Sequence, residues 1–273
     1  FESGETISEN GAEMMTANAY LGAGPIASAL EIGADIIITG RVADASLLVG
    51  CMLHSAGWAY NAFQLSLTRE SPVVDWAPEH VTNPLDILAQ WTVAGHLIEC
   101  GAQVCGGNYS NWAEVPNLAT LTLPIAEVYA DGEVKITRGQ GGGGMVNRGI
   151  VAEQLIYEIG DPAAYITPDV VVDMRNITIE DESEDVVLVS GALGKAEPES
   201  LKVSAAVEGG WFATSSLLVS GPDALARATA CDAALRGRLS ALEELEIYTE
   251  FIGGGVTLPE NIRQQISPTL NPP

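Results

Sequence analysis

The apolar, β-branched run at residues 34–40, ADIIITG, constrains the fold more than any other feature of the chain. Seven residues are too few for a typical helix, and three successive isoleucines are typical of a strand buried on both faces. A helix is predicted before the run over 24–32, with Pro25 in its first turn, and a loop and second helix are predicted after it over 41–58. This order predicts an α/β layer with a parallel sheet.

Further elements extend the pattern. A helix is predicted from Pro84 to about Gly101, and Asp131-Gly132 between alternating runs predicts a hairpin over 120–138. A fourth helix is predicted over 146–160. Beyond Pro168 the sequence is rich in β-branched residues, and strands are expected at 170–180, 185–191, 201–208 and 214–221. An Ala-rich helix is expected at 223–245, followed by one more strand at 246–255.

We therefore predict an α/β fold with a partly parallel sheet and flanking helices, followed by a smaller α+β part. The predicted boundaries give an α/β part over 1–168, an α+β part over 169–257 and a Pro-containing tail over 258–273.

The net charge of the chain limits the classes of partner that it can bind. The chain has 12 Lys and Arg residues against 36 Asp and Glu residues, a net charge of −24. Nucleic acids and anionic membranes require clustered basic residues, so neither is an expected partner. There is no apolar run of transmembrane length, and the four cysteines show no CxxC pair, so we expect a reduced, cytoplasmic protein. A homo-oligomer is also expected, because most soluble oligomeric proteins are homo-oligomers.

The first candidate site follows the predicted strand at 34–40. Ligands bind outside the carboxyl ends of strands in open α/β sheets. Arg41 could pair with a carboxylate or phosphate, and Ser46 lies in the same segment. Asp44 could be a general base or a metal ligand, and the alternative is that it only caps the following helix.

The second candidate is the pair His96 and Glu99, which share one helix face at a spacing of three. They could bind a metal ion, or Glu99 could orient His96 for proton transfer. The alternative is a structural histidine packed against a carboxylate. Cys100 could be a nucleophile, although an apolar helix favours a buried structural thiol.

Two Gly-containing segments are also candidates. Arg138 precedes the glycines Gly141, Gly142 and Gly143, and Arg148 follows them, so converging N–H groups and arginines could bind a phosphate. A flexible linker is the alternative. In a separate segment, Gly107 would admit a ligand close to the backbone and Asn108 could donate to an oxyanion, with a plain turn as the alternative.

Four long segments resemble the acyclic terpene utilisation family (the AtuA type). They are TANAYLGAGPI, EIGADIIITGRVADASLLVG, TVAGHLIECGAQVCGGN and EQLIYEIGDPAAYITPDVVVD, in order between residues 16 and 174. The residues that match the family motifs are Arg41, Asp44, Ser46, His96, Glu99, Gly107 and Asn108. The Gly-rich loop matches in position, but its four consecutive glycines are less typical. Members usually begin with a further α/β segment, so the resemblance implies that the chain lacks an upstream part.

The resemblance implies a catabolic enzyme acting on a branched, terpenoid-type acyl-CoA, with a 3-hydroxy-acyl-CoA carbon–carbon lyase as the leading reaction. Asp44 or the His96–Glu99 pair would be the base, and Asn108 or a divalent cation would stabilise the enolate. Asp44, His96 and Glu99 would be the metal-ligand candidates, and the arginines would bind the CoA phosphates. The alternatives are a thioester hydrolase and a non-catalytic partner of an acyl-CoA carboxylase or of a small accessory domain.

Overall fold

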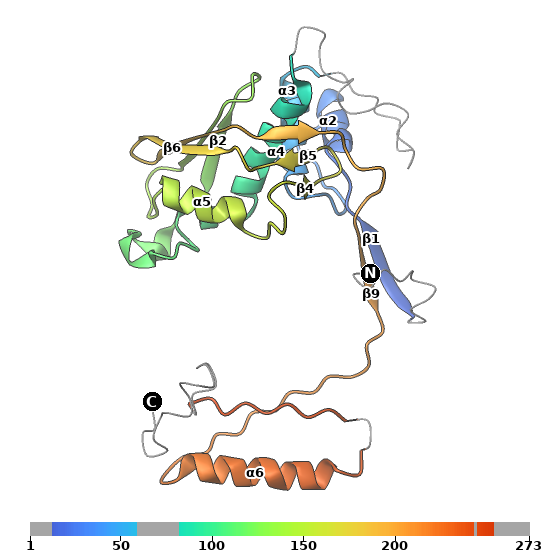
Figure 1. Ribbon diagram of the computed structural model, residues 1–273, viewed down its shortest axis with the longest axis vertical. Coiled ribbons are helices and arrows are strands. Elements are labelled where there is room, and N and C mark those ends of the chain that lie inside the picture. Colours follow the sequence, from blue (N-terminus) through green and yellow to red (C-terminus); the bar gives the residue numbers. More distant parts are fainter. Residues whose placement is uncertain (1–12, 59–81, 243–244, 254–273) are drawn as a thin grey trace. The chain divides into compact units, whose positions relative to one another are not determined.

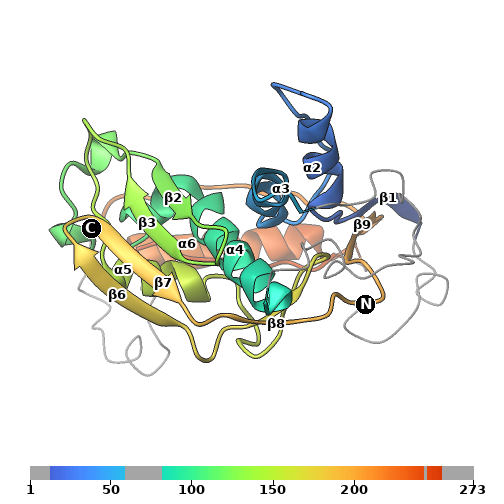
Figure 2. The same cartoon turned by 90° about the horizontal axis from the view of Figure 1, so that it is seen from above.

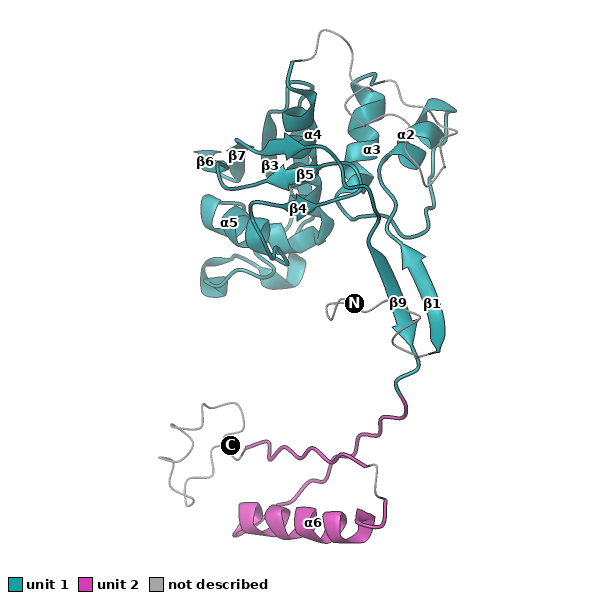
Figure 3. Cartoon of the chain, turned by 45° about the vertical axis from the view of Figure 1, so that its right-hand side comes forward, with its two compact units in different colours: residues 1–209 teal, residues 210–273 magenta. Residues whose placement is uncertain are grey.

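The computed structural model describes residues 13–58, 82–242 and 245–253. The chain divides into two compact units, residues 1–209 and residues 210–273 (Figure 3). The predicted tail at 258–273 lies outside the described residues. The sequence-based division at 168 and 257 stays a prediction.

Unit 1 combines helices with short strands. Its α-helices are α2 (Gly24–Glu31), α3 (Ser46–Ser55), α4 (Pro84–Glu99) and α5 (Arg148–Ile156), and its 3₁₀ helices are η2 (Gly101–Cys105), η3 (Trp112–Glu114) and η4 (Leu118–Thr120). Its strands are β1 (Met14–Ala19), β2 (Pro124–Val128), β3 (Val134–Arg138), β4 (Tyr165–Ile166), β5 (Val171–Asp173), β6 (Thr178–Ser183), β7 (Val186–Ser190), β8 (Leu193–Lys195) and β9 (Val203–Val207). Unit 2 contains α6 (Ala224–Leu239).

The predicted parallel sheet is wrong. The described strands form three sheets, β1-β9, β2-β3-β7-β6 and β4-β5-β8, and every strand pairing in them is antiparallel. Parallel pairing in the described residues is limited to two isolated bridges, Leu21 with Val42 and Leu121 with Gly143. Several of these strands are joined by tight turns, which permit only antiparallel neighbours.

The segment 34–40 is the physical reason for this error. It forms no strand, and Ile36 and Ile38 are 83% and 93% exposed. A β-branched side chain favours a strand only where a neighbouring strand and a core give it a surface to pack on. No strand of the described chain pairs with this run, so its composition does not produce a buried strand.

Helix α4 forms the centre of unit 1 (Figure 2). Every residue from Leu88 to Leu97 is buried, and a helix that is apolar on most faces is expected inside a core. The ring of Trp91 packs against that of Trp58 at 4.7 Å between centroids. Buried side chains of β3 and β7 complete the core around α4, namely Val134, Ile136, Val187 and Val189.

Most elements with local signals form as predicted. Strands β2 and β3 make the expected hairpin, in which Gly132 has a φ of 94°. The side chain of Asn147 caps α5 by accepting from the N–H of Ile150 at 2.9 Å. In unit 2, α6 ends at Leu239, and the strands predicted at 214–221 and 246–255 are absent from the described residues. Among the described residues, none of α6 is buried, in contrast to α4.

Strands β1 and β9 form a two-stranded ribbon at one edge of unit 1 (Figure 1). Nearly all of its residues are exposed or only partly covered. Among the described residues, no helix is both long and apolar enough to cross a membrane.

Candidate functional site

Four segments that lie far apart in the sequence meet at the N-terminal end of α3. They contribute the backbone before α2, the loop that carries Asp44, the C-terminal half of α4 and the turn after β4. Two contacts establish this meeting: Ser46 donates its hydroxyl to Asp169 at 2.5 Å, and the ideal Cβ position of Gly95 is 2.5 Å from the carbonyl oxygen of Ala45. Each segment belongs to one of the stretches that carry the family resemblance.

Asp169 is the buried anchor of this junction. Its carboxylate accepts the N–H of Ala23 at 2.8 Å, at the start of α2, as well as the hydroxyl of Ser46 in the first turn of α3. Two helix N-termini therefore face one carboxylate, an arrangement that their dipoles favour. Sequence reasoning missed Asp169. The signal that could have found it is an aspartate directly after Thr167-Pro168, since Pro predicts a turn there.

Gly95 allows the loop of Asp44 to lie directly on α4. Three backbone atoms of Ala45 are within 3.0 Å of the position that a Cβ at residue 95 would occupy, so only glycine fits without displacement. Asp44 directly precedes Ala45 in the chain, and Glu99 lies one helical turn beyond Gly95 on α4. Asp44 does not cap α3, because the cap position is Ala45 and no side chain caps the helix.

His96 is fully enclosed, and both of its ring nitrogens face acceptors. Nδ1 lies 3.3 Å from Oε1 of Glu99, while Nε2 lies 3.1 Å and 3.2 Å from the carbonyl oxygens of Gln154 and Leu155 at the end of α5. His96 therefore holds α4 to α5 and orients Glu99, with neither nitrogen left for a metal ion.

The charges of nearby carboxylates influence two further side chains at this end of α4. Burial, followed by the charges of Glu99, Asp44 and Glu158, raises the pKa of the Tyr165 phenol. Burial and the charge of Glu99 likewise raise the pKa of the Cys100 thiol. Tyr165 therefore keeps its proton at neutral pH and can act as a donor beside a carboxylate. Its ring packs against His96 at 5.3 Å between centroids.

The described residues contain no preformed site for the predicted metal ion. Among the residues that the structure describes, no group of three or more His, Cys, Asp or Glu side chains is arranged to hold a metal ion. Asp44 and Glu99 lie in the same cluster, but both nitrogens of His96 are already engaged. The side chains that this cluster offers for chemistry are therefore carboxylates and a phenol.

The Gly-rich loop is built around Arg138. The guanidinium donates to Asp185 at 2.8 Å, and the carbonyl oxygens of Gly142 and Gly143 lie 3.3 Å and 3.4 Å from its Nη1. The N–H of Gly143 donates to the carbonyl of Thr120 at 2.8 Å. Arg138 and this N–H thus bond within the protein, and the phosphate site predicted here stays a prediction.

The glycines of this loop have a packing role. A Cβ on Gly142 would lie 2.6 Å from the carbonyl oxygen of Thr120, and one on Gly143 would lie 2.1 Å from that of Asn117. Gly141, by contrast, has open space around it and a φ of 84°. The loop therefore packs tightly against the segment before β2.

Three further predicted site residues lie in the turn after η2 and at the start of α5. Gly107 donates its N–H to the carbonyl of Ala102 at 2.9 Å in the turn after η2. Asn108 is exposed at a very small hollow that Gln154 also lines, so it shares one neighbour with His96. Arg148 is exposed at the start of α5, where its N–H donates to Asp181.

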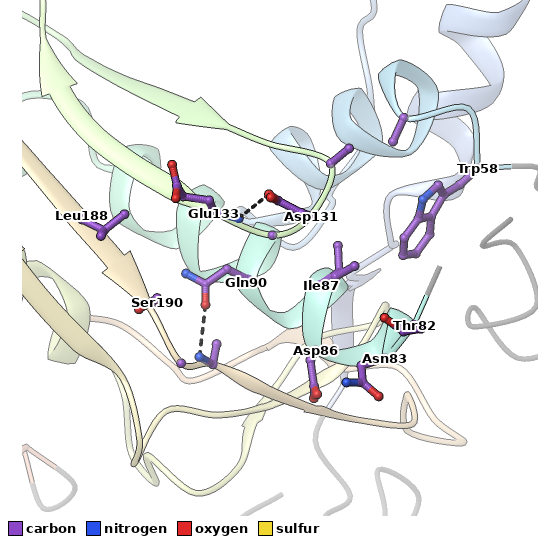
Figure 4. Close-up of a pocket in the computed structure, with 15 residues that line it drawn as sticks. Trp58, Thr82, Asn83, Asp86, Ile87, Gln90, Asp131, Glu133, Leu188 and Ser190 are labelled. Carbon is purple, nitrogen blue, oxygen red and sulfur yellow. Dashed lines mark hydrogen bonds between the residues drawn. The ribbon is translucent and has the colours of Figure 1, made fainter. Parts of the chain in front are cut away.

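A separate open cavity of about 740 Å³ lies at the N-terminal half of α4 (Figure 4). Trp58, Ile87 and Leu188 form apolar parts of its lining, and its carboxylates are Asp86 and Glu133 together with Asp131. No basic residue lines it among the described residues, so it suits an uncharged apolar group better than an anion. It does not include the carboxylate cluster around Tyr165.

Comparison with known proteins gives one match. Residues 1–66 and 74–267 match the sequence model of a family described as "Acyclic terpene utilisation family protein AtuA". No curated protein and no solved structure matches the chain.

Proposed function

The chain belongs to the acyclic terpene utilisation family, which implies a role in the use of acyclic terpenes, and from this premise we propose a catabolic enzyme for branched, terpenoid-type acyl-CoA. The proposed reaction is carbon–carbon cleavage of a 3-hydroxy-acyl-CoA. One observation supports the proposal: the family segments meet where the loop of Asp44 lies on α4, and the charges of Glu99 and Asp44 both act on Tyr165. A carboxylate base beside a protonated phenol is the pair that this reaction requires.

The chemical step assigns one role to each group. The carboxylate of Asp44 removes the proton of the 3-hydroxyl, whose O–H electron pair becomes the second bond of the new C3 carbonyl. The C2–C3 bond breaks, and its electron pair moves onto the thioester as an enolate. Tyr165 donates a hydrogen bond to the developing charge, and the proton that Asp44 took from the hydroxyl passes to C2, which completes the shorter thioester and restores the carboxylate. Glu99 is held by His96 and is a positioning residue for this centre.

Product analysis by mass spectrometry tests the proposal. Full-length protein is incubated with a panel of branched 3-hydroxy-acyl-CoA thioesters, with Mg²⁺ and with a chelator. Two carbon fragments are expected, whereas free CoA with an intact acyl chain would indicate a hydrolase. Asp44→Asn should lower turnover by about 10²–10⁴-fold, the usual contribution of a general base. Asp35→Asn, the same change at an exposed aspartate, is the matched control. Unchanged turnover in both Asp44→Asn and Tyr165→Phe would refute the residue assignment.

A non-catalytic partner of an acyl-CoA carboxylase is the second candidate. The observation that favours it is apolar surface in unit 2, where Trp211 and Phe212 are 103% and 91% exposed. Exposed aromatic side chains are frequent in protein interfaces. Capture of a carboxylase subunit by the wild-type chain, with loss in a Trp211→Ser and Phe212→Ser variant and no thioester turnover, would support this candidate over the enzyme.

A further inference from the structure

Two basic side chains share one aromatic ring beside the carboxylate junction. The guanidinium carbon of Arg41 lies 5.4 Å from the ring centroid of Tyr20, and Nζ of Lys202 lies 4.8 Å from the same centroid. Both distances are within the range of a cation–π interaction. The two cations are consequently no more than about 10 Å apart, within one Debye length at about 0.1 M salt.

This pairing is unusual in so acidic a chain. Asp and Glu outnumber Lys and Arg by 36 to 12. Of the five other basic residues in the described part of unit 1, four contact a carboxylate, namely Lys135, Arg138, Arg175 and Lys195, and the fifth is Arg148. No carboxylate of the described residues pairs with Arg41 or Lys202. Two like charges kept together without a counter-charge repel each other, and a bound anion would remove that cost.

The backbone fixes the position of all three side chains. Tyr20 follows β1 and donates its N–H to the carbonyl of Lys202 at 2.9 Å, just before β9. The next residue, Leu21, donates to the carbonyl of Arg41 at 3.1 Å and accepts from Ala43 at 2.9 Å. Arg41 therefore lies on the loop that carries Asp44, and Lys202 is joined to the same region through the backbone of Tyr20.

We propose that Arg41, Lys202 and the ring of Tyr20 form an anion-binding site for the negatively charged end of the substrate. The chemistry suits the phosphates of CoA or a carboxylate on the acyl part, because each can accept from a guanidinium and an ammonium together. This inference rests on the proposed function for the identity of the ligand. It assigns Tyr20 and Lys202, which are not among the residues predicted from the sequence, to substrate recognition.

Calorimetric titration of the full chain with CoA, inorganic pyrophosphate and glutarate tests the site without turnover. Arg41→Met combined with Lys202→Met should weaken binding about tenfold or more and reduce its salt dependence. Arg227→Met combined with Arg238→Met removes the same charge from exposed positions on α6 and should change affinity less than about twofold. Tyr20→Leu, which keeps both charges, should weaken binding about two- to fivefold.

Comparison of the three ligands distinguishes the phosphates of CoA from a carboxylate on the acyl part as the bound anion. Loss of CoA and pyrophosphate binding would identify the phosphates, and loss of glutarate binding alone would identify an acyl carboxylate. If every ligand binds the Arg41 and Lys202 variant, with circular dichroism confirming its fold, as tightly as the wild type, the proposal is wrong even where thioesters turn over. Binding that depends on the pair, in a protein that cleaves no thioester, would instead refute the proposed reaction and retain the site.

Discussion

The contact between α3 and α4 predicts that Gly95→Ala destabilises the protein, although alanine is the better helix former. An added Cβ would lie 2.5 Å from the carbonyl oxygen of Ala45, 2.9 Å from its Cα and 3.0 Å from its carbonyl carbon. The next residue, Ser46, is hydrogen-bonded to Asp169, so this backbone cannot easily move aside. Overpacking costs about 1–3 kcal/mol, and we take the upper part because the neighbours are backbone atoms. Helix propensity offsets about 1 kcal/mol, which leaves a net loss of about 1–2 kcal/mol.

Hydrogen exchange resolved by peptide measures this loss in α4. Gly237→Ala is the matched control, because it is the same substitution inside α6, where an added Cβ meets nothing within 4 Å. The opening free energy of α4 should fall by about 1–2 kcal/mol in Gly95→Ala, while that of α6 should rise by about 0.5–1 kcal/mol in Gly237→Ala. Turnover should also fall in Gly95→Ala, since the displaced loop carries Asp44 away from Glu99.

An unchanged or more stable α4 in Gly95→Ala would refute this reasoning. It would mean that the backbone of Ala45 moves at little cost. The close approach would then not be what sets the position of Asp44.

Three further predictions follow from single contacts. Ser46→Ala removes a hydrogen bond to the buried carboxylate of Asp169 and should lower the free energy of unfolding by about 1.5–3 kcal/mol in urea titrations; a loss below about 0.5 kcal/mol would contradict it. Hydrogen bonds from Arg175 lower the pKa of Asp173, so this carboxylate contributes stability above about pH 4 that is lost as the pH falls through its lowered pKa. Asp173→Asn should therefore reduce the loss of stability on acidification. If urea unfolding shows the same decrease in unfolding free energy at low pH in the variant and the wild type, the ion pair does not contribute this stability. Burial raises the pKa of the Cys105 thiol to about 11, whereas Cys51 is exposed. A disulfide reagent at about pH 8 should therefore modify Cys51 first and Cys105 only on unfolding. Mass spectrometry that finds Cys105 modified before Cys51 would contradict this order.

Where a signal is local, the sequence alone determined the outcome. Pro25 and Pro84 mark the first turns of α2 and α4, and Asp131-Gly132 marks the hairpin. The spacing of three between His96 and Glu99 brings those side chains to 3.3 Å without help from the rest of the chain. These features depend on a few neighbouring residues, so a single sequence carries them.

Only the tertiary structure decided what those elements surround. Ile36 and Ile38 remain exposed because no strand of the described chain lies beside them, which composition could not reveal. Ser46 meets Asp169 across 123 residues, and Arg138 meets Asp185 across 47. Such pairings depend on how whole elements pack, and many partners are equally compatible with the local sequence. The convergence of Asp44, Glu99 and Tyr165 is therefore a property of the packed helices and not of any one motif.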